Sequence, residues 1–447
     1  MAPADGDRPG KTSRTPGGSV HSSGSVPHES AAPTGQTPSH GSERKSLAAR
    51  LETLSRRGPD AVSDIVDAII ETAVRLEASD LHLEPASDQM MIRMRLDGVM
   101  QDFGSLPAEL APNIVARCKV MADLLTYRCN VPQEGGASGA DYAPGLDLRV
   151  STYPTLHGER VAIRLFDSTT RLETLGQLGL TEPIENTLAA SLCAPEGLIL
   201  LSGPSGSGKT TTLYACLNHI RKSSRGGRHV VSVEDPIENE IEGVTQTAVN
   251  RSVALTFAAS LRSLLRQDPE VIMVGEIRDA ETAHIAVEAA LTGHLVLSTV
   301  HAPRAALVPH RLLDMGVEPY SLAGALTLVL SQRLVRRLCP ECSRPVSSEE
   351  VDSLPPAVRE SARVAVGCPA CQHTGYSGRL LLAELIETSE NLHDAIMARA
   401  SRREFLQIAA RQEDIVSMAW DKVRTGRTTA FDVQRVLGKR TTGANEE

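Results

Sequence analysis

The sequence predicts an α/β protein in which a domain built on a parallel β-sheet follows a smaller α+β domain. Two patterns lead to this fold class. Between residues 47 and 168, helical periodicity is mixed with hairpin-like alternation, which indicates a compact α+β domain. After a short linker, apolar strands alternate with helices, which is typical of a parallel sheet. The chain has 447 residues, enough for about three domains, and its 41% of apolar residues supply ample core material.

The charge balance restricts the classes of function. Lys and Arg number 46 against 55 Asp and Glu, a formal net charge of −9. This balance gives no support to a protein that coats nucleic acid, although it leaves room for a local basic stripe. No apolar run approaches the ~18 residues that cross a bilayer, and the N-terminus lacks the apolar stretch of a signal peptide. We therefore expect a cytoplasmic chain whose membrane contact is peripheral or made through a partner.

The elements are expected in the following order. Residues 1–46 are rich in Ser, Gly, Pro and Thr and are predicted to be disordered, either as a plain flexible tail or as a tether for a partner. In the α+β domain we expect helices at 61–77 and about 109–125, a strand at 90–96 ending in the hairpin dipeptide Asp97–Gly98, and strand-like segments within 146–166.

A phosphate-binding loop follows the first strand of the parallel sheet, 198–201. Residues 203–210 match G-x-x-x-x-G-K-[ST], with a strand before and a helix after. Backbone amides of such a loop cradle phosphates, and the helix N-terminus adds a positive dipole. Lys209 is expected to reach the β- and γ-phosphates of ATP, and the Thr210 hydroxyl to bind Mg²⁺. The predicted nucleotide-binding residues are Gly203, Pro204, Ser205, Gly206, Ser207, Gly208, Lys209, Thr210 and Thr211.

Polar residues also follow three further predicted strands, 229–233, 271–274 and 295–300. Ligands of open α/β sheets bind beyond the carboxyl ends of the strands, so we expect Glu234, Glu276 and His301 to converge on the triphosphate. Glu276 is expected to orient or deprotonate the attacking water. Glu234 either binds Mg²⁺ through water or shares the role of base, and His301 is either a γ-phosphate sensor or a structural histidine.

A second site is predicted from cysteine spacing. The chain has eight cysteines, which should be reduced thiols in the cytoplasm. Two C-x-x-C pairs, Cys339/Cys342 and Cys368/Cys371, offer four thiolates to one tetrahedral Zn²⁺, a closed structural site; a redox pair or free thiols are the alternative. The remaining cysteines are expected to be small buried hydrophobes: Cys118, Cys129, Cys193 and Cys216.

Four segments resemble the motifs of a known family. They are the phosphate loop and its helix start at 203–214, residues 233–238 with Phe257 and 266–269, residues 271–279, and residues 292–301. In this order they are similar to the Walker A motif, aspartate box, Walker B motif and histidine box of the secretion ATPases of type II secretion and type IV pilus assembly. The two C-x-x-C pairs and residues 78–85, 148–152 and 374–379 also fit, and the similarity covers about residues 61–440.

This resemblance implies a RecA-like motor domain over 169–335, preceded by a PAS-like domain over 47–168 and followed by a tetracysteine subdomain over 336–380 and a helical C-terminal subdomain over 381–447. It further implies a homo-hexamer on the cytoplasmic face of the inner membrane, where it contacts membrane-platform proteins and couples ATP hydrolysis to pilus or pseudopilus assembly. The tetracysteine insert favours an assembly motor over a retraction motor.

The resemblance also suggests that arginines of the preceding domain reach the nucleotide. The matching residues are Arg149, Arg160 and Arg164. Arg149 and Arg164 are the preferred candidates for neutralising charge on the γ-phosphate, with surface or salt-bridge roles as the alternative.

The chain departs from the family pattern in three places. Residues 131–137 lack the arginine usual there and lead into a Gly/Ala/Ser loop, and His301-Ala-Pro303 replaces His-Thr-Asn. The predicted disordered segment stands where many members carry a domain that docks on a platform protein. Two other functions stay open: a nucleotide-gated scaffold with little hydrolysis, and a motor for DNA uptake or transfer.

Overall fold

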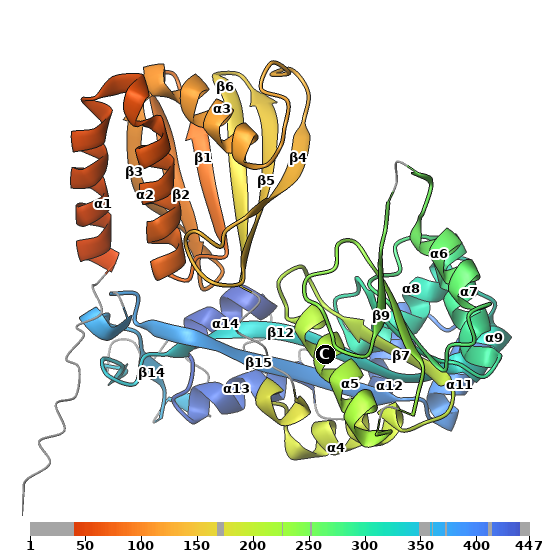
Figure 1. The fold of residues 1–447 in the computed structure, drawn as a ribbon. Helices are drawn as coiled ribbons and strands as arrows, with labels where there is room; N and C mark the ends of the chain where they lie inside the picture. Colours follow the sequence, from red (N-terminus) through yellow and green to blue (C-terminus); the bar gives the residue numbers. More distant parts are fainter. Residues whose placement is uncertain are drawn as a thin grey trace, which may run out of the picture. The chain divides into compact units, whose positions relative to one another are not determined.

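The structure is a computed structural model that describes residues 40–167, 174–225, 227–250, 253–347, 358–359, 361–371, 373–409 and 414–438 (Figure 1). Most of the predicted disordered tail, residues 1–39, lies outside this set. Its last residues were predicted wrongly, because helix α1 spans His40–Ser55. Leu47 and Leu51 of α1 are buried in the core of the α+β domain, and Arg75 pairs with Glu43 at 2.8 Å. These contacts order a segment whose composition alone suggested a tail.

The α+β domain contains a six-stranded antiparallel sheet in the order β3-β2-β1-β6-β5-β4. Helices α1, α2 (Val62–Arg75) and α3 (Ala111–Met121) supply apolar side chains to the same core as the sheet. Buried and half-buried residues alternate strictly along β2, as its sequence predicted. The strands are β1 Asp80–Pro85, β2 Gln89–Leu96, β3 Val99–Pro107, β4 Gln133–Ser138, β5 Leu146–Thr155 and β6 Gly158–Asp167.

Two elements of this domain differ from expectation. Helix α3 ends at Met121, earlier than predicted, and Asp123 has a φ of 56°, which the helix cannot continue through. Residues 133–138, which include most of the stretch 131–137 that was expected to lead into a Gly/Ala/Ser loop, form edge strand β4. A Cβ atom on Gly135 would lie 2.2 Å from the carbonyl oxygen of Ala122, so the glycine allows β4 to approach the end of α3.

The second domain contains a seven-stranded sheet in the order β15-β12-β7-β11-β10-β8-β9, parallel except for β15 against β12. Every residue of β7, β8, β10 and β11 is buried, as expected for strands covered on both faces. The strands are β7 Gly197–Ser202, β8 Val230–Glu234, β9 Thr245–Ala248, β10 Val271–Val274, β11 Leu295–Val300, β12 Leu326–Leu338 and β15 Tyr376–Glu387. The four predicted strands of this sheet are therefore confirmed.

Alternate strand residues face two separate cores. Leu198 and Leu200 of β7 belong to the core that includes α6 (Phe257–Leu264), α7 (Ala280–Leu291), α8 (Val308–Asp314) and α9 (Pro319–Ala325). Ile199 and Leu201 belong to the core that includes α4 (Glu182–Leu192) and α5 (Lys209–Ser223). Helices thus cover both faces, which leaves the carboxyl ends of the strands as the edge where ligands bind.

The sheet continues beyond the predicted domain limits. Strand β12 crosses residue 335 and β15 crosses residue 380, so neither limit separates structural units. Between these strands lie the four cysteines and a short ribbon of β13 (Arg344–Pro345) and β14 (Arg363–Val364). The C-terminal helices are confirmed as α11 Glu390–Met397, α12 Arg402–Ala409, α13 Ile415–Arg424 and α14 Ala430–Leu437. Within the described ranges, no helix has the length and apolarity needed to cross a bilayer.

Candidate nucleotide-binding site and metal centre

The predicted phosphate loop joins β7 to α5 at residues 203–208. Gly203 has a φ of +146°, and a Cβ atom there would lie 2.5 Å from the carbonyl oxygen of Gln332. Gly208, at φ +90°, is the N-cap of α5. Glycine is required at both positions, because other residues are strained in this region of φ. The loop therefore presents the free amides at the start of α5 to the carboxyl edge of the sheet.

Lys209 and Ser207 fit a phosphate. The Lys209 Nζ donates hydrogen bonds to the carbonyl oxygens of Gly203 and Pro204, both at 2.9 Å, so the ammonium group is held over the loop. Burial lowers the pKa of Lys209; the nearby Glu276 carboxylate opposes this shift and the Arg333 guanidinium adds to it. The Ser207 hydroxyl is buried and has no hydrogen-bond partner within the described part of the chain. A phosphate oxygen would supply that partner.

Glu276 and His301 lie beside this loop, as the sequence predicted. Glu276 follows β10, forms an ion pair with Arg278 and is largely buried. His301 follows β11; its Nε2 lies 3.8 Å from Glu276 Oε2, and its Nδ1 lies 3.2 Å from the carbonyl oxygen of Gly203. The structure therefore brings one carboxylate and one imidazole to the loop that holds Lys209.

Glu234, at the end of β8, has a different environment. Its buried carboxylate accepts hydrogen bonds from Tyr214 Oη at 2.5 Å, Ser232 Oγ at 2.6 Å and Gln246 Nε2 at 2.9 Å. Burial, followed by the hydrogen bond to Glu234, raises the pKa of Tyr214, which keeps its hydroxyl protonated as a donor. Three donors fix the orientation of this carboxylate and occupy much of its accepting capacity.

Sequence reasoning missed several groups around the loop. Thr210 Oγ1 points to Glu238 Oε1 at 3.5 Å, and Gln332 Nε2 donates to the Thr212 hydroxyl at 2.8 Å, which joins β12 to α5. Tyr214 ends the motif 203–214, but only its contact with Glu234 shows its role. Gln332 and Arg333 belong to a strand far along the chain, and no local pattern marks them.

The three arginines lie together in the α+β domain. Arg149 and Arg164 are cross-strand partners on β5 and β6, and Arg160 also lies on β6. Each has a carboxylate partner in its own domain: Arg149 with Glu134 at 2.5 Å, Arg160 with Glu84 at 2.9 Å and Arg164 with Asp80 at 3.5 Å. Within the α+β domain, the three arginines therefore form salt bridges, which is the role expected for them as the alternative to a contact with the γ-phosphate.

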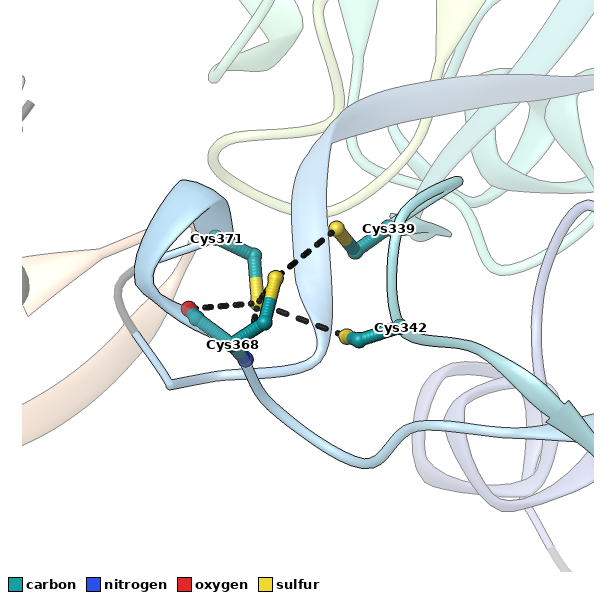
Figure 2. A group of neighbouring side chains, drawn as sticks. All are labelled: Cys339, Cys342, Cys368 and Cys371. Atoms are coloured by element: carbon teal, nitrogen blue, oxygen red, sulfur yellow. Dashed lines mark hydrogen bonds between the residues drawn. The ribbon is translucent and has the colours of Figure 1, made fainter. Parts of the chain in front are cut away.

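The four predicted zinc ligands converge (Figure 2). All four sulfur atoms lie within 4.8 Å of one another. The spacing is 3.8 Å for Cys339–Cys368 and 3.7 Å for both Cys342–Cys371 and Cys368–Cys371. Two sulfurs that each bind one tetrahedral Zn²⁺ at about 2.3 Å are about 3.8 Å apart. The geometry therefore fits zinc, and four protein ligands leave no position for catalysis.

Backbone amides donate hydrogen bonds to two of these sulfurs, whose thiol pKa values shift in opposite directions, because burial raises the pKa of Cys342 to about 12. The amides of Gly367 and Gly375 donate to the sulfurs of Cys342 and Cys371, both at 3.2 Å. Burial opposes ionisation of Cys371, but amide hydrogen bonds from Cys368 and Gly375 outweigh it and lower its pKa to about 7. A Cβ atom on Gly375 would lie 2.5 Å from the Cβ of Ala365, so only glycine fits at this position next to the cysteine cluster.

The prediction for the other cysteines is partly wrong. Cys118 and Cys216 are buried, as expected, and burial raises the pKa of each thiol to about 12. Cys129 and Cys193 are exposed, because Cys129 lies in the loop after α3 and Cys193 lies at the C-terminal cap of α4.

The fold and the phosphate-loop site define this protein as a P-loop ATPase. The chain belongs to the family of type II/IV secretion system proteins, whose family model matches residues 56–436. Type II secretion system protein E of Aeromonas hydrophila is 43% identical over 378 residues, which cover 83% of this chain and 75% of that protein. Type II secretion system ATPase E of Vibrio cholerae is also 43% identical over 378 residues, covering 83% and 74%. The predicted family is confirmed.

Solved structures support the fold. The pilus retraction motor PilT with bound ADP superposes with a TM-score of 0.56 at 22% identity, covering 83% of this chain and 96% of that one. The Legionella pneumophila ATPase DotB gives a TM-score of 0.59 at 22% identity, covering 83% and 94%. The predicted fold class is thus confirmed.

Proposed function

We propose that the chain is the motor ATPase of a type II secretion system, which hydrolyses ATP with Mg²⁺ and drives pseudopilus assembly; assembly of a type IV pilus is the closest alternative. The proposal rests mainly on the convergence of Lys209, Glu276 and His301 on one phosphate loop. The 43% identity to a type II secretion system ATPase supports the choice of system.

Each residue of the site has its own role in ATP hydrolysis. Lys209 and the loop amides bind the β- and γ-phosphates, and the Thr210 hydroxyl would hold Mg²⁺, which neutralises charge on the phosphates. Glu276 acts as the base that orients and deprotonates water, because its carboxylate lies beside Lys209 and His301. His301 hydrogen-bonds the γ-phosphate. Three donors fix Glu234, which favours a supporting role, with Mg²⁺ contact through water.

The assembly is a homo-hexamer with ATP bound at subunit boundaries. Arg149 and Arg164 exchange their carboxylate partners for the γ-phosphate during turnover, as an arginine finger does. The tetracysteine site holds one Zn²⁺ as a structural staple. The hexamer works on the cytoplasmic face of the inner membrane and contacts it through platform proteins, without direct binding of nucleic acid.

Two substitutions test the ATPase site. Lys209→Ala should abolish ATP turnover, and Glu276→Gln should keep ATP binding but slow hydrolysis by about 100-fold or more. Glu281→Gln, which alters an exposed carboxylate on α7, is the matched control. Normal hydrolysis by Glu276→Gln would transfer the role of base to Glu234. A wild-type protein that binds ATP without turnover would support the nucleotide-gated scaffold.

Mixed hexamers test the arginines. Lys209→Ala and Arg149→Ala subunits, each inactive alone, should regain part of the activity when mixed if Arg149 acts across a boundary. No recovery at any ratio would leave Arg149 with its salt bridge to Glu134. Affinity purification from native membranes then identifies the system: a pseudopilus platform supports the proposal, whereas a pilus platform or a DNA-transfer channel replaces it.

A further inference from the structure

A buried carboxylate outside the site described above lies on the edge strand β15. Glu384 is only 4% exposed. The Nε of Arg304 donates to both of its oxygens, at 3.0 and 2.8 Å, and the amide of Ala305 donates to Oε1 at 2.6 Å. The amide of Ile415, at the start of α13, lies 3.5 Å from Oε2. Glu384 therefore connects β15 to Arg304 and Ala305, at the end of the loop that begins at His301.

The loop from His301 to Ala305 is held at a second point by β12. Arg333 donates from Nη2 to the carbonyl oxygen of Pro303 at 2.6 Å and from Nη1 to the carbonyl oxygen of Gln332 at 2.8 Å. Residues 303–305 thus contact two strands of the sheet through charged side chains. His301, at the other end of this loop, is largely exposed, and its ring lies against Gly203 and Glu276.

The sheet register places these contacts level with the phosphate loop. Glu384 pairs with Ser331 of β12, and Ser331 pairs with Ser202 of β7, the residue before Gly203. Both serine hydroxyls are buried and lack a hydrogen-bond partner among the described residues. Neither serine therefore competes for the Glu384 carboxylate, whose hydrogen bonds within the described residues lead to the 301–305 loop and to α13.

The charges explain why the carboxylate is needed. Burial lowers the pKa of Arg333; the Glu384 carboxylate opposes this shift, and the Arg304 guanidinium adds to it. Two guanidiniums thus share one buried anion. Without that anion they would repel each other, and Arg304 would lose the partner of its Nε.

We propose that Glu384 is a positioning residue for ATP hydrolysis, which acts through Arg304 to hold the 301–305 loop so that His301 stays against Gly203 and Glu276. The proposal rests on the proposed function, because it assumes that His301 acts on the nucleotide. The contacts of Glu384 with Arg304 and Ala305 link it to the 301–305 loop, and its effect on hydrolysis passes through that loop.

A double-mutant cycle tests this on the full-length protein. Glu384→Gln keeps the size of the side chain and removes its charge. It should lower kcat by about tenfold and change the KM for ATP less than threefold. His301→Ala should lower kcat by a similar factor. If Glu384 acts through His301, then adding Glu384→Gln to His301→Ala should change kcat less than about twofold. Multiplicative effects in the double variant would overturn the proposal.

Further variants separate positioning from folding. Arg304→Gln leaves Glu384 its contact with the Ala305 amide and should repeat the loss of kcat, whereas Arg304→Lys should restore part of it. Arg399→Gln breaks an exposed pair with Glu318 and should keep wild-type kinetics. A Glu384→Gln protein that has normal kcat and only a lower unfolding midpoint would reduce the residue to a structural role and overturn the proposal.

The Lys209→Ala variant distinguishes the two levels of failure. If Lys209→Ala retains ATP turnover, the proposed site itself is wrong and the inference falls with it. If Lys209→Ala is inactive while the effects of Glu384→Gln and His301→Ala multiply, the site stands and only the positioning role fails.

Discussion

Replacing Tyr214 by phenylalanine isolates one hydroxyl that joins α5 to the end of β8. Tyr214 is buried, and its Oη donates to Glu234 at 2.5 Å and accepts from the amides of Glu238 and Asn239 at 3.1 and 3.3 Å. Tyr214→Phe leaves no cavity, because it removes only the hydroxyl. The change therefore measures the hydrogen bonds without a packing contribution.

The expected loss of stability is about 2–3 kcal/mol. A hydrogen bond to a charged group contributes roughly 1.5–3 kcal/mol. The two amides add little, since Glu238 is exposed and Asn239 is half-buried, so that water can replace the hydroxyl. Glu234 keeps Ser232 and Gln246 as donors, which limits the loss to one bond.

The effect of Tyr214→Phe should not vary between pH 6 and 9. Burial and the bond to Glu234 raise the pKa of Tyr214 above the 10.0 of an unfolded tyrosine. A raised folded-state pKa means that the contribution is fully present below the unfolded value and is lost only as pH rises through the folded value. The stability difference should therefore begin to shrink only above about pH 10.

Equilibrium unfolding in urea, followed by tertiary-structure signals, measures this loss, and steady-state turnover measures its consequence. Glu234 Oε2 should lose its donor, so that the carboxylate is held less rigidly and kcat should fall while the KM for ATP changes little. Tyr320→Phe, at a 78% exposed position in the same domain, is the matched control. A change below about 0.5 kcal/mol, equal to that of the control, would refute the assigned strength of the Tyr214–Glu234 bond.

Two further predictions concern the metal and the lysine. Cys342→Ser should reduce bound zinc from about one per chain to nearly none and lower the thermal midpoint, whereas Cys129→Ser, at an exposed cysteine outside the cluster, should change neither; elemental analysis and calorimetry check this, and full metal content in Cys342→Ser would contradict the site. Because burial lowers the pKa of Lys209 below its ordinary value of 10.5, ATP affinity should begin to fall at a pH below 10.5 as the ammonium deprotonates. Titration calorimetry across pH should show this decline in the wild type but not in Lys209→Arg, and a flat wild-type profile would contradict it.

Local sequence patterns were sufficient for the parts of the site that are continuous in the chain. The phosphate loop needs glycines at 203 and 208 for backbone reasons, and fully buried strands such as β10 consist of uninterrupted apolar residues. The cysteine pairs could also be recognised from the sequence, because a C-x-x-C spacing supplies two ligands to one ion. In each case the physical requirement acts on neighbouring residues.

Elements that depend on contacts between residues far apart in the chain could not be predicted from the sequence. Strand β4 is polar and glycine-rich, and it forms because β5 pairs with it and Gly135 fits against Ala122. The predicted domain limit at residue 335 was wrong, because buried and half-buried residues do not alternate regularly along β12 and the strand continues to Leu338. Glu384 and Arg304 are 80 residues apart, and nothing near either residue predicts their contact.

Strand β12 connects the metal centre to the nucleotide-binding site. The middle of β12 contacts the nucleotide-binding site through Gln332 and Arg333. Near its end, Arg336 pairs with the buried Asp432 of α14 at 2.8 Å. The strand then leads into Cys339. Its neighbour β15 is an edge strand, held by β12 on one side only. The four cysteines join the end of β12 to the start of β15, so a bound ion would fix the register between the strand that contacts the phosphate loop and the strand that carries Glu384. Loss of the ion should then weaken hydrolysis through β15 even though no ligand of the metal lies in the nucleotide site.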